Sequence, residues 1–300
     1  MTKKIRKAII PAAGYGTRFL PATKAQPKEM LPLVDKPIIQ YVVEEAVSAG
    51  IEDVIIVTGW HKRNIEDHFD YPFELEQRLE SAGKQEELEE IRRIANLANF
   101  HYLRQKGPLG NATAIWNART IVGDEPFLVL WADDILEATP TRSQQLIKAY
   151  EELGGSVVLA SMRANKPEDY SRYAYVVGSE VKPGLIKVEQ MVEKPGPGKI
   201  NSSFAIPGGT IYGPEIFDAI EIVMRNLEKE NNSRELVYVD AIDILLKQGK
   251  PVHAVEINNG KYYDCGNKLE YLKAVVEFGL KHEDLREEFS DFLRNLKSNL

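Results

Sequence analysis

The first part of the chain has the pattern of a strand, a helix and a second strand, and this order constrains the fold more than any other feature. The apolar run Lys7–Ile10 predicts one strand, and Asp53–Thr58 predicts another. Between them, Ile38–Ala49 places apolar residues at helical spacing and stops at Gly50. Such a unit requires two parallel strands joined by a right-handed crossover. The sequence therefore predicts an α/β fold.

Later segments predict more strands, and their character changes after residue 160. The continuous apolar runs Phe127–Trp131 and Ser156–Ala160 are typical of strands in a sheet that is covered on both faces. In contrast, Tyr173–Val177 and Ile186–Val192 resemble antiparallel strands with one exposed face. The highly charged segment Phe73–Asn99 carries one apolar stripe, which predicts a solvated helix with one packed face.

The end of the chain predicts two helices. Asn267–Glu270 has the pattern of a capping box that opens a helix. A second helix is expected from about Glu283, with Leu285, Phe289, Leu293 and Leu296 apolar. This pair either packs on the core or joins two subunits, and the sequence leaves both arrangements open.

Charge and cysteine content exclude several classes of function. The chain has 300 residues and a net charge of -7, so binding to nucleic acid or to an anionic membrane through bulk charge is not expected. No apolar run approaches the ~20 residues of a membrane span, and no secretory signal pattern opens the chain. The single cysteine, Cys265, has no partner within the chain, which is typical of a reducing compartment. We therefore expect a cytoplasmic protein.

A glycine-rich loop, Gly14–Arg18, follows the first predicted strand directly. Its two glycines let the backbone turn sharply and approach an anion, and successive N–H groups can then face phosphate oxygens. Arg18 adds a bidentate donor, and Lys24 and Lys28 add point charges. The third glycine of a dinucleotide-binding loop and the Gly-Lys-Ser/Thr of a Walker A loop are both missing. On its own, the loop indicates a phosphate contact and nothing more specific.

The longer stretch around this loop resembles the signature of the sugar-nucleotide pyrophosphorylases. The similarity runs through Gly14–Lys24 and Pro27–Leu33 and then returns in the expected order along most of the chain. The later matching segments are residues 36–45, 62–70, 123–126, 192–195, 213–217 and 263–266.

This resemblance implies a fold and a division of the chain. The fold is α/β, with a Rossmann-like mixed, mainly parallel central sheet flanked by helices, an antiparallel sugar-binding region and C-terminal helices. One nucleotidyltransferase domain would cover residues 1–280, with a nucleotide half over about 1–160 and a sugar-binding half over about 161–266. The C-terminal helices would cover residues 267–300.

The resemblance also implies a reaction, in which UTP and α-D-glucose 1-phosphate give UDP-glucose and pyrophosphate. The sugar phosphate attacks the α-phosphorus in line, a step that needs charge neutralisation and alignment more than a covalent catalyst. A thymidylyltransferase, or a uridylyltransferase for another sugar 1-phosphate, remains an alternative, as does a nucleotide-sugar-binding paralogue with weak activity. UTP and a sugar 1-phosphate are the expected partners, and a homo-oligomer (dimer or tetramer) is the expected assembly.

Two aspartates match the family's positions for magnesium. Asp133 follows the strand predicted at Phe127–Trp131, and the carboxyl ends of such strands are where open α/β sheets bind ligands. Asp264 belongs to a second aspartate motif much later in the chain. Two carboxylates that share one Mg²⁺ with phosphate oxygens and water are ordinary magnesium chemistry. Asp134 is the alternative ligand at the first position.

The remaining site residues are implied by the same match. Arg18 and Lys28 would steady the triphosphate and the departing pyrophosphate. Gln105 would read the pyrimidine edge, since an amide offers a donor and an acceptor together. The full set implied to bind the nucleotide is Ala12, Ala13, Gly14, Gly16, Thr17, Gln105 and Gly110.

On the sugar side, Glu193 would accept the sugar hydroxyls and Lys194 would hold the sugar phosphate. The family usually has Tyr-Gly in the strand that contacts the sugar, whereas here Tyr173 is followed by Ala174. We expect the added methyl group of Ala174 to make the sugar pocket tighter. Asn111 also departs from the family pattern, because it replaces the usual histidine after the base-reading glycine.

Overall fold

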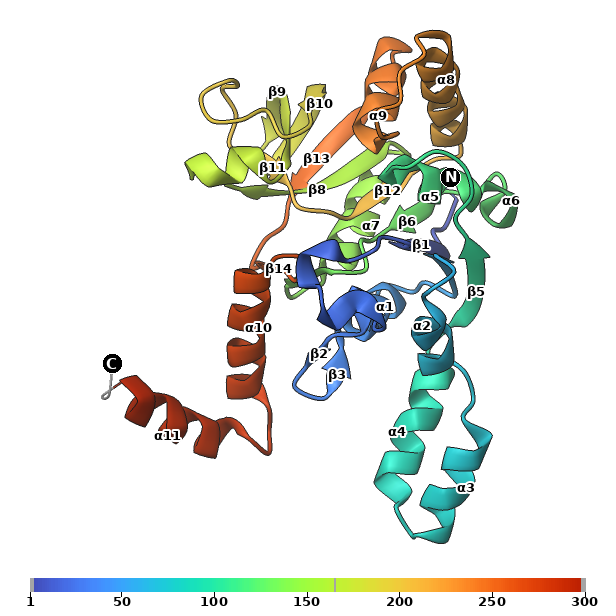
Figure 1. Ribbon diagram of the computed structural model, residues 1–300. Helices are drawn as coiled ribbons and strands as arrows, with labels where there is room; N and C mark the ends of the chain where they lie inside the picture. Colours follow the sequence, from blue (N-terminus) through green and yellow to red (C-terminus); the bar gives the residue numbers. More distant parts are fainter. Residues whose placement is uncertain (1–2, 165, 298–300) are drawn as a thin grey trace.

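The computed structural model describes residues 3–164 and 166–297, and a ten-stranded mixed sheet forms its centre (Figure 1). The order of strands across the sheet is β11-β9-β10-β13-β8-β12-β6-β1-β4-β5. The strands are β1 (Lys7–Ala12), β4 (Asp53–Thr58), β5 (Asn99–Arg104), β6 (Phe127–Val129), β8 (Val157–Arg163), β9 (Ala174–Lys182), β10 (Leu185–Val192), β11 (Phe204–Ile206), β12 (Thr210–Tyr212) and β13 (Val252–Glu256). Two small antiparallel ladders join β2 (Pro32–Leu33) to β3 (Lys36–Pro37), and β7 (Asp134–Glu137) to β14 (Lys261–Asp264).

The first strands follow the expected crossover. β1 lies between β4 and β6 and is parallel to both, and β4 is parallel to β5. The strand expected at Asp53–Thr58 is confirmed in full, and the first strand continues two residues beyond Ile10. The expected helix is α1 (Ile38–Ser48). The carboxyl ends of these parallel strands meet at one edge, where α/β sheets bind ligands.

The parallel part of the sheet is smaller than expected. β12 runs antiparallel to both β6 and β8, and β9, β10 and β11 pair with their neighbours antiparallel. The only parallel pair that the structure describes outside the β6-β1-β4-β5 group joins β8 to β13. The antiparallel strands expected after residue 160 are confirmed as β9 and β10. β6 ends at Val129, earlier than expected, whereas β8 extends to Arg163 because β11 and β13 pair along its end.

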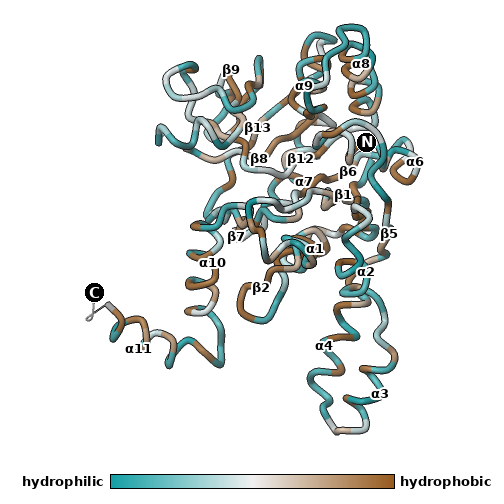
Figure 2. Tube along the Cα trace, viewed as in Figure 1, coloured by the Kyte–Doolittle hydropathy of each residue, from teal (hydrophilic) through white to brown (hydrophobic). Residues whose placement is uncertain are grey.

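Helices cover both faces of the sheet. Along β1, Ile9 packs with α5 (Asn111–Asn117), α8 (Glu215–Lys229) and α9 (Tyr238–Lys247), while Ile10 packs with α1 and α7 (Arg142–Glu152) on the other face, as the two-residue period of a strand requires. Figure 2 shows the resulting hydrophobic interior along the strands. The remaining helices are α2 (Arg63–His68), α3 (Phe73–Ser81), α4 (Gln85–Ala95), α6 (Arg119–Val122), α10 (Lys268–Lys281) and α11 (Arg286–Lys297).

The charged segment expected to form one helix forms two instead. α3 and α4 make a hairpin that extends away from the sheet (Figure 1). Gly83 breaks the helix, since its φ of 69° is the left-handed conformation that ends helices and that glycine adopts freely. Glu76 and Arg92 join the two helices through an ion pair of 2.7 Å.

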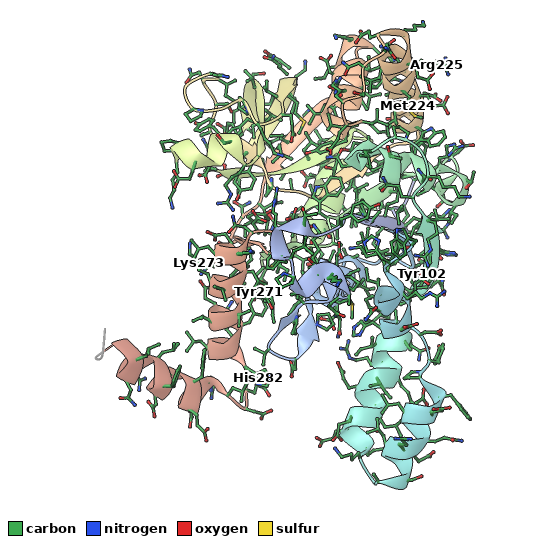
Figure 3. The ribbon with its side chains drawn as sticks, in the orientation of Figure 1. Tyr102, Met224, Arg225, Tyr271, Lys273 and His282 are labelled. Carbon is green, nitrogen blue, oxygen red and sulfur yellow. The ribbon has the colours of Figure 1, made fainter. Side chains whose placement is uncertain are left out.

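The two C-terminal helices differ in how they pack. Phe278 of α10 lies in a cluster with Leu33 and Tyr263, so α10 packs on the core. Figure 3 shows Tyr271 on the side of α10 that faces the domain, where its hydroxyl donates to the carbonyl of Pro32 at 2.9 Å. α11 extends outward beyond α10 (Figure 1). Residues 298–300 of the expected C-terminal segment lie outside the described residues.

Two details of these helices correct the sequence-based expectation. The Asn267 side chain caps α10 by accepting from two backbone N–H groups, but Glu270 pairs with Lys273 and does not complete a capping box. α11 begins at Arg286, slightly later than the expected Glu283. In the part of the chain that the structure describes, no helix is long and apolar enough to cross a membrane.

Candidate active site

A polar cleft of about 490 Å³ opens between segments that are far apart in the sequence. Its walls come from the last residue of the glycine loop, the residues after β6, the start of β9, the residues after β10, and the end of β14. Six of the residues implied by the family resemblance line it together: Arg18, Asp133, Ala174, Glu193, Lys194 and Asp264.

Asp133 and Asp264 converge on Gly266. A Cβ atom at Gly266 would lie 2.6 Å from Asp133 Oδ2 and 3.2 Å from Asp264 Oδ1, so both carboxylates border a space that only glycine leaves open. Among residues 3–164 and 166–297, no group of three or more His, Cys, Asp or Glu side chains could hold a metal. The two carboxylates fit a Mg²⁺ that takes its other ligands from phosphates and water, as magnesium commonly does. Sequence reasoning did not single out Gly266, although it directly follows Cys265 in the aspartate motif.

The geometry distinguishes Asp133 from its alternative, Asp134. Asp134 is buried, and its Oδ1 accepts a hydrogen bond from the Tyr262 hydroxyl at 2.7 Å. Burial, together with the charges of Asp133 and Asp264, raises the pKa of Asp134 well above its ordinary value. Asp133 keeps part of its side chain exposed to the cleft. The arrangement therefore favours Asp133 as the ligand and gives Asp134 a hydrogen-bonding role.

Each of the two cleft carboxylates already contacts a cation. The Lys28 ammonium group contacts Asp133 Oδ2, and Arg172 Nη2 donates to Asp264 Oδ2 at 2.8 Å. Burial opposes the charge on Lys28, but Asp133 and Glu29 outweigh it and raise the pKa of Lys28 above that of an ordinary lysine. Lys28 therefore stays cationic at neutral pH. Sequence reasoning missed Arg172, although it directly precedes the Tyr-Ala pair that marks the sugar side.

The other two basic residues of the cleft are more loosely held. Arg18 Nη1 reaches the carbonyl of Gly266 at 3.5 Å, the outer limit of a hydrogen bond. Lys194 Nζ lies 3.4 Å from Glu193, and half of its side chain is exposed. Both cations are therefore available to a phosphate group.

The glycine loop is folded onto the segment that carries Lys28. Gly16 has a φ of 65°, and a Cβ there would lie 3.2 Å from Lys28 Cβ. The Thr23 hydroxyl fixes the turn by donating to the carbonyl of Gly16 at 2.7 Å. Ala12 ends β1, Ala13 and Gly14 follow it, and Thr17 begins a short 3-10 helix. The loop therefore lies at the carboxyl edge of the parallel strands.

The two predicted base-reading residues do not line the cleft itself. Gln105 follows β5, and its N–H donates to the carbonyl of Thr58 at the end of β4, so it shares the edge with the glycine loop. Gly110 has a φ of 137°, and a Cβ there would lie 2.0 Å from the carbonyl oxygen of Leu236. Its neighbour Asn111 lines the cleft and accepts from the N–H of Tyr238 at 2.9 Å.

Aromatic side chains complete the lining of the cleft, and sequence reasoning missed most of them. Trp131 and Tyr238 line the cleft with their ring centroids 5.6 Å apart, and Tyr173 and Tyr262 line it as well. Trp131 was assigned only to a strand, because it ends an apolar run. Ala174 is buried and lines the same cleft.

Comparison with known proteins gives concordant matches. The nucleotidyl transferase family model matches residues 7–279. The chain is 46% identical to a UTP–glucose-1-phosphate uridylyltransferase of Bacillus subtilis (strain 168), with 98% of each chain covered. A UTP-bound UGPase from Acinetobacter baumannii matches with a TM-score of 0.86 and 35% identity, covering 97% of this chain and 99% of that one. A UDP-glucose pyrophosphorylase complexed with UDP-glucose matches with a TM-score of 0.80 and 37% identity, covering 93% and 100%.

Proposed function

The chain belongs to the nucleotidyl transferase family, and from that premise we propose that it transfers the uridylyl group of UTP to glucose 1-phosphate, giving UDP-glucose and pyrophosphate. The observation that carries this function is the cleft in which Arg18 and Lys194 face the carboxylates of Asp133 and Asp264. The Bacillus subtilis relative is named for this activity, and solved relatives hold UTP or UDP-glucose.

The basic residues of the cleft neutralise and align the two substrates. Arg18 and Lys28 hold the triphosphate and stabilise the departing pyrophosphate, and Lys194 holds the sugar phosphate for in-line attack. Glu193 accepts the sugar hydroxyls beside Ala174. Phosphoryl transfer of this kind gains its rate from positioning and electrostatics, so no covalent intermediate is required.

In this proposal the nucleotide lies on the half formed by residues 1–160 and the sugar on the half formed by residues 161–266. Gln105, at the shared edge of β4 and β5, and the backbone of Gly110, just before α5, read the uracil edge. The backbone from Ala12 to Gly14, with Gly16 and Thr17, lies along the nucleotide. The C-terminal helices α10 and α11 follow these two halves in the sequence.

Asp133 and Asp264 are the proposed ligands of Mg²⁺. When bound, Mg²⁺ neutralises charge on the phosphates as they react. The glycine at position 266 keeps the space between the two carboxylates free for the ion.

Gly266→Ala tests these ligands without removing either carboxylate. The new methyl group would lie 2.6 Å from Asp133 Oδ2, so that carboxylate must shift. Mn²⁺ is a convenient substitute for Mg²⁺, and we expect its affinity, measured by electron paramagnetic resonance, to fall at least about tenfold, since metal sites depend strictly on ligand placement. Gly83→Ala, outside the cleft, serves as the control: nothing lies within 4 Å of the added methyl group, but its φ of 69° strains the backbone, so the variant shows what a strained glycine-to-alanine change alone does to Mn²⁺ affinity. An unchanged Mn²⁺ affinity would show that the metal binds elsewhere.

A pyrophosphate-release assay tests the proposed reaction directly. UTP and dTTP are each combined with several sugar 1-phosphates, with and without Mg²⁺. We expect release that depends on Mg²⁺ and is fastest with UTP and glucose 1-phosphate. No release from any pair would disprove nucleotidyl transfer, whereas a preference for another sugar would change only the substrate.

We also infer a homo-oligomer, either a dimer or a tetramer, and a cytoplasmic location. Several apolar side chains on α10 and α11 are exposed in the isolated chain, and such surfaces are typical of subunit contacts. They are Leu269, Leu272, Leu280, Phe292 and Leu296. Light scattering coupled to size-exclusion chromatography measures the assembly.

The cytoplasmic location is inferred from the single cysteine, Cys265, which is buried and free.

A further inference from the structure

Arg172 forms an ion pair with Asp264, one of the two proposed metal ligands. Its guanidinium donates to Asp264 Oδ2 at 2.8 Å, while Asp264 Oδ1 accepts from the N–H of Gly266 at 3.1 Å. Both oxygens of Asp264 therefore have donors. A metal ion that binds Asp264 must compete with the guanidinium for the same carboxylate.

Arg172 comes from a different part of the molecule than its partner. It follows the short 3-10 helix Pro167–Ser171 and precedes β9 on the sugar side, whereas Asp264 ends β14. The guanidinium lies in the cleft, 5.2 Å from the centre of the Tyr173 ring, and Arg172 and Lys194 line the same cavity. Roughly a quarter of the Arg172 side chain is exposed. A small movement would therefore free it to meet an anion in the cleft.

We propose that Arg172 binds the phosphate of the sugar substrate, and that it stays paired with Asp264 until Mg²⁺ binds that carboxylate. This inference rests on the uridylyl transfer proposed above. Without the metal, the guanidinium neutralises Asp264. With the metal bound, the planar donor fork of Arg172 is released toward the sugar phosphate, for which its geometry is suited. Metal and sugar phosphate then favour each other's binding, and this coupling is reciprocal.

Arg172→Met separates the two roles because it changes two affinities in opposite directions. Removing the guanidinium frees Asp264, so we expect Mn²⁺ to bind about two- to fivefold more tightly, the range that a partly exposed ion pair allows. At saturating Mg²⁺, we expect glucose 1-phosphate to bind about tenfold or more weakly, because a charge-assisted contact is lost. Electron paramagnetic resonance measures the first affinity, and calorimetry measures the second.

Two further variants make the comparison specific. Arg163→Met removes a similar ion pair, to Glu256 at 3.1 Å, outside the cleft, and is expected to change neither affinity. Arg172→Lys keeps the charge but loses the fork, and is expected to recover part of the sugar-phosphate affinity. If Arg172→Met fails to fold, Arg172→Lys supplies the comparison, with weaker shifts in the same two directions.

The outcomes separate this inference from the proposed function. Weaker binding of both Mn²⁺ and glucose 1-phosphate would show that Arg172 is structural and would overturn the exchange. Unchanged Mn²⁺ affinity with weaker glucose 1-phosphate binding would overturn it too, because the guanidinium would then not compete with the metal for Asp264. Failure of uridylyl transfer itself would appear in the unmodified chain, as an absence of pyrophosphate release.

Discussion

Asp264→Asn is expected to lower the rate of pyrophosphate release by about two to three orders of magnitude, the loss typical of removing one electrostatic contact from a reacting centre. Asparagine has the same shape and still accepts the N–H of Gly266, which Asp264 Oδ1 accepts at 3.1 Å. It lacks the negative charge that makes a carboxylate a much stronger ligand than a neutral amide for a hard divalent cation. We therefore expect the fold to survive while the metal is lost. The measurement is kcat/KM for UTP at several Mg²⁺ concentrations, together with near-ultraviolet circular dichroism.

A surface aspartate supplies the matched control for this variant. Asp243 lies on α9 and pairs with Lys247 at 2.5 Å on an exposed surface. Asp243→Asn removes the same charge outside the cleft, so turnover should be nearly unchanged. Near-normal turnover in Asp264→Asn would show that the metal assignment is wrong. Partial recovery of Asp264→Asn at high Mg²⁺ would indicate that Asp133 and the phosphates still hold the ion weakly.

The spacing of apolar residues predicted the parallel part of the fold, because in the structure those helices and strands bury the faces on which the apolar residues recur. α1 and β4 match the expected ranges to within one residue. The α3–α4 hairpin was missed for a physical reason, since no side chain of α3 is buried. Its pattern therefore has no buried face that would mark a separate helix, and the sequence sign of the break is Gly83, which adopts the left-handed conformation.

The site was predictable where one residue matched one family position, and not where its role depends on a distant partner. The sequence offered Asp133 and Asp134 as neighbours, and the hydrogen bond from Tyr262 is what distinguishes them. The contact between Arg172 and Asp264 joins residues that are 92 positions apart, so no local spacing indicates it. Predicting such pairs requires knowing that β7 pairs with β14, which brings the Asp264 motif to the end of β6.

A buried ion pair beside Lys28 carries the largest expected effect on stability. Lys62 Nζ lies 2.7 Å from Glu29 Oε2, and each side chain is only 1% exposed. Glu29 is the neighbour of Lys28, so this pair anchors the segment that presents Lys28 to Asp133. Burial raises the pKa of Glu29 and lowers the pKa of Lys62, so the surroundings disfavour either charge alone.

Lys62→Met is therefore expected to lower the free energy of unfolding by about 3–5 kcal/mol, because it leaves the Glu29 carboxylate buried without a partner. Removing both charges in Lys62→Met with Glu29→Leu should recover most of that loss, since a buried ion pair is often no more stabilising than apolar side chains of similar volume. Urea unfolding of the single and double variants measures the difference. If the double variant is as unstable as Lys62→Met alone, the loss comes from packing around Lys62 and not from an uncompensated charge. If the double variant is stable but has a raised KM for UTP, the Lys62–Glu29 pair serves to position Lys28. The two charges would then matter to UTP binding, while apolar side chains would replace them without loss of stability.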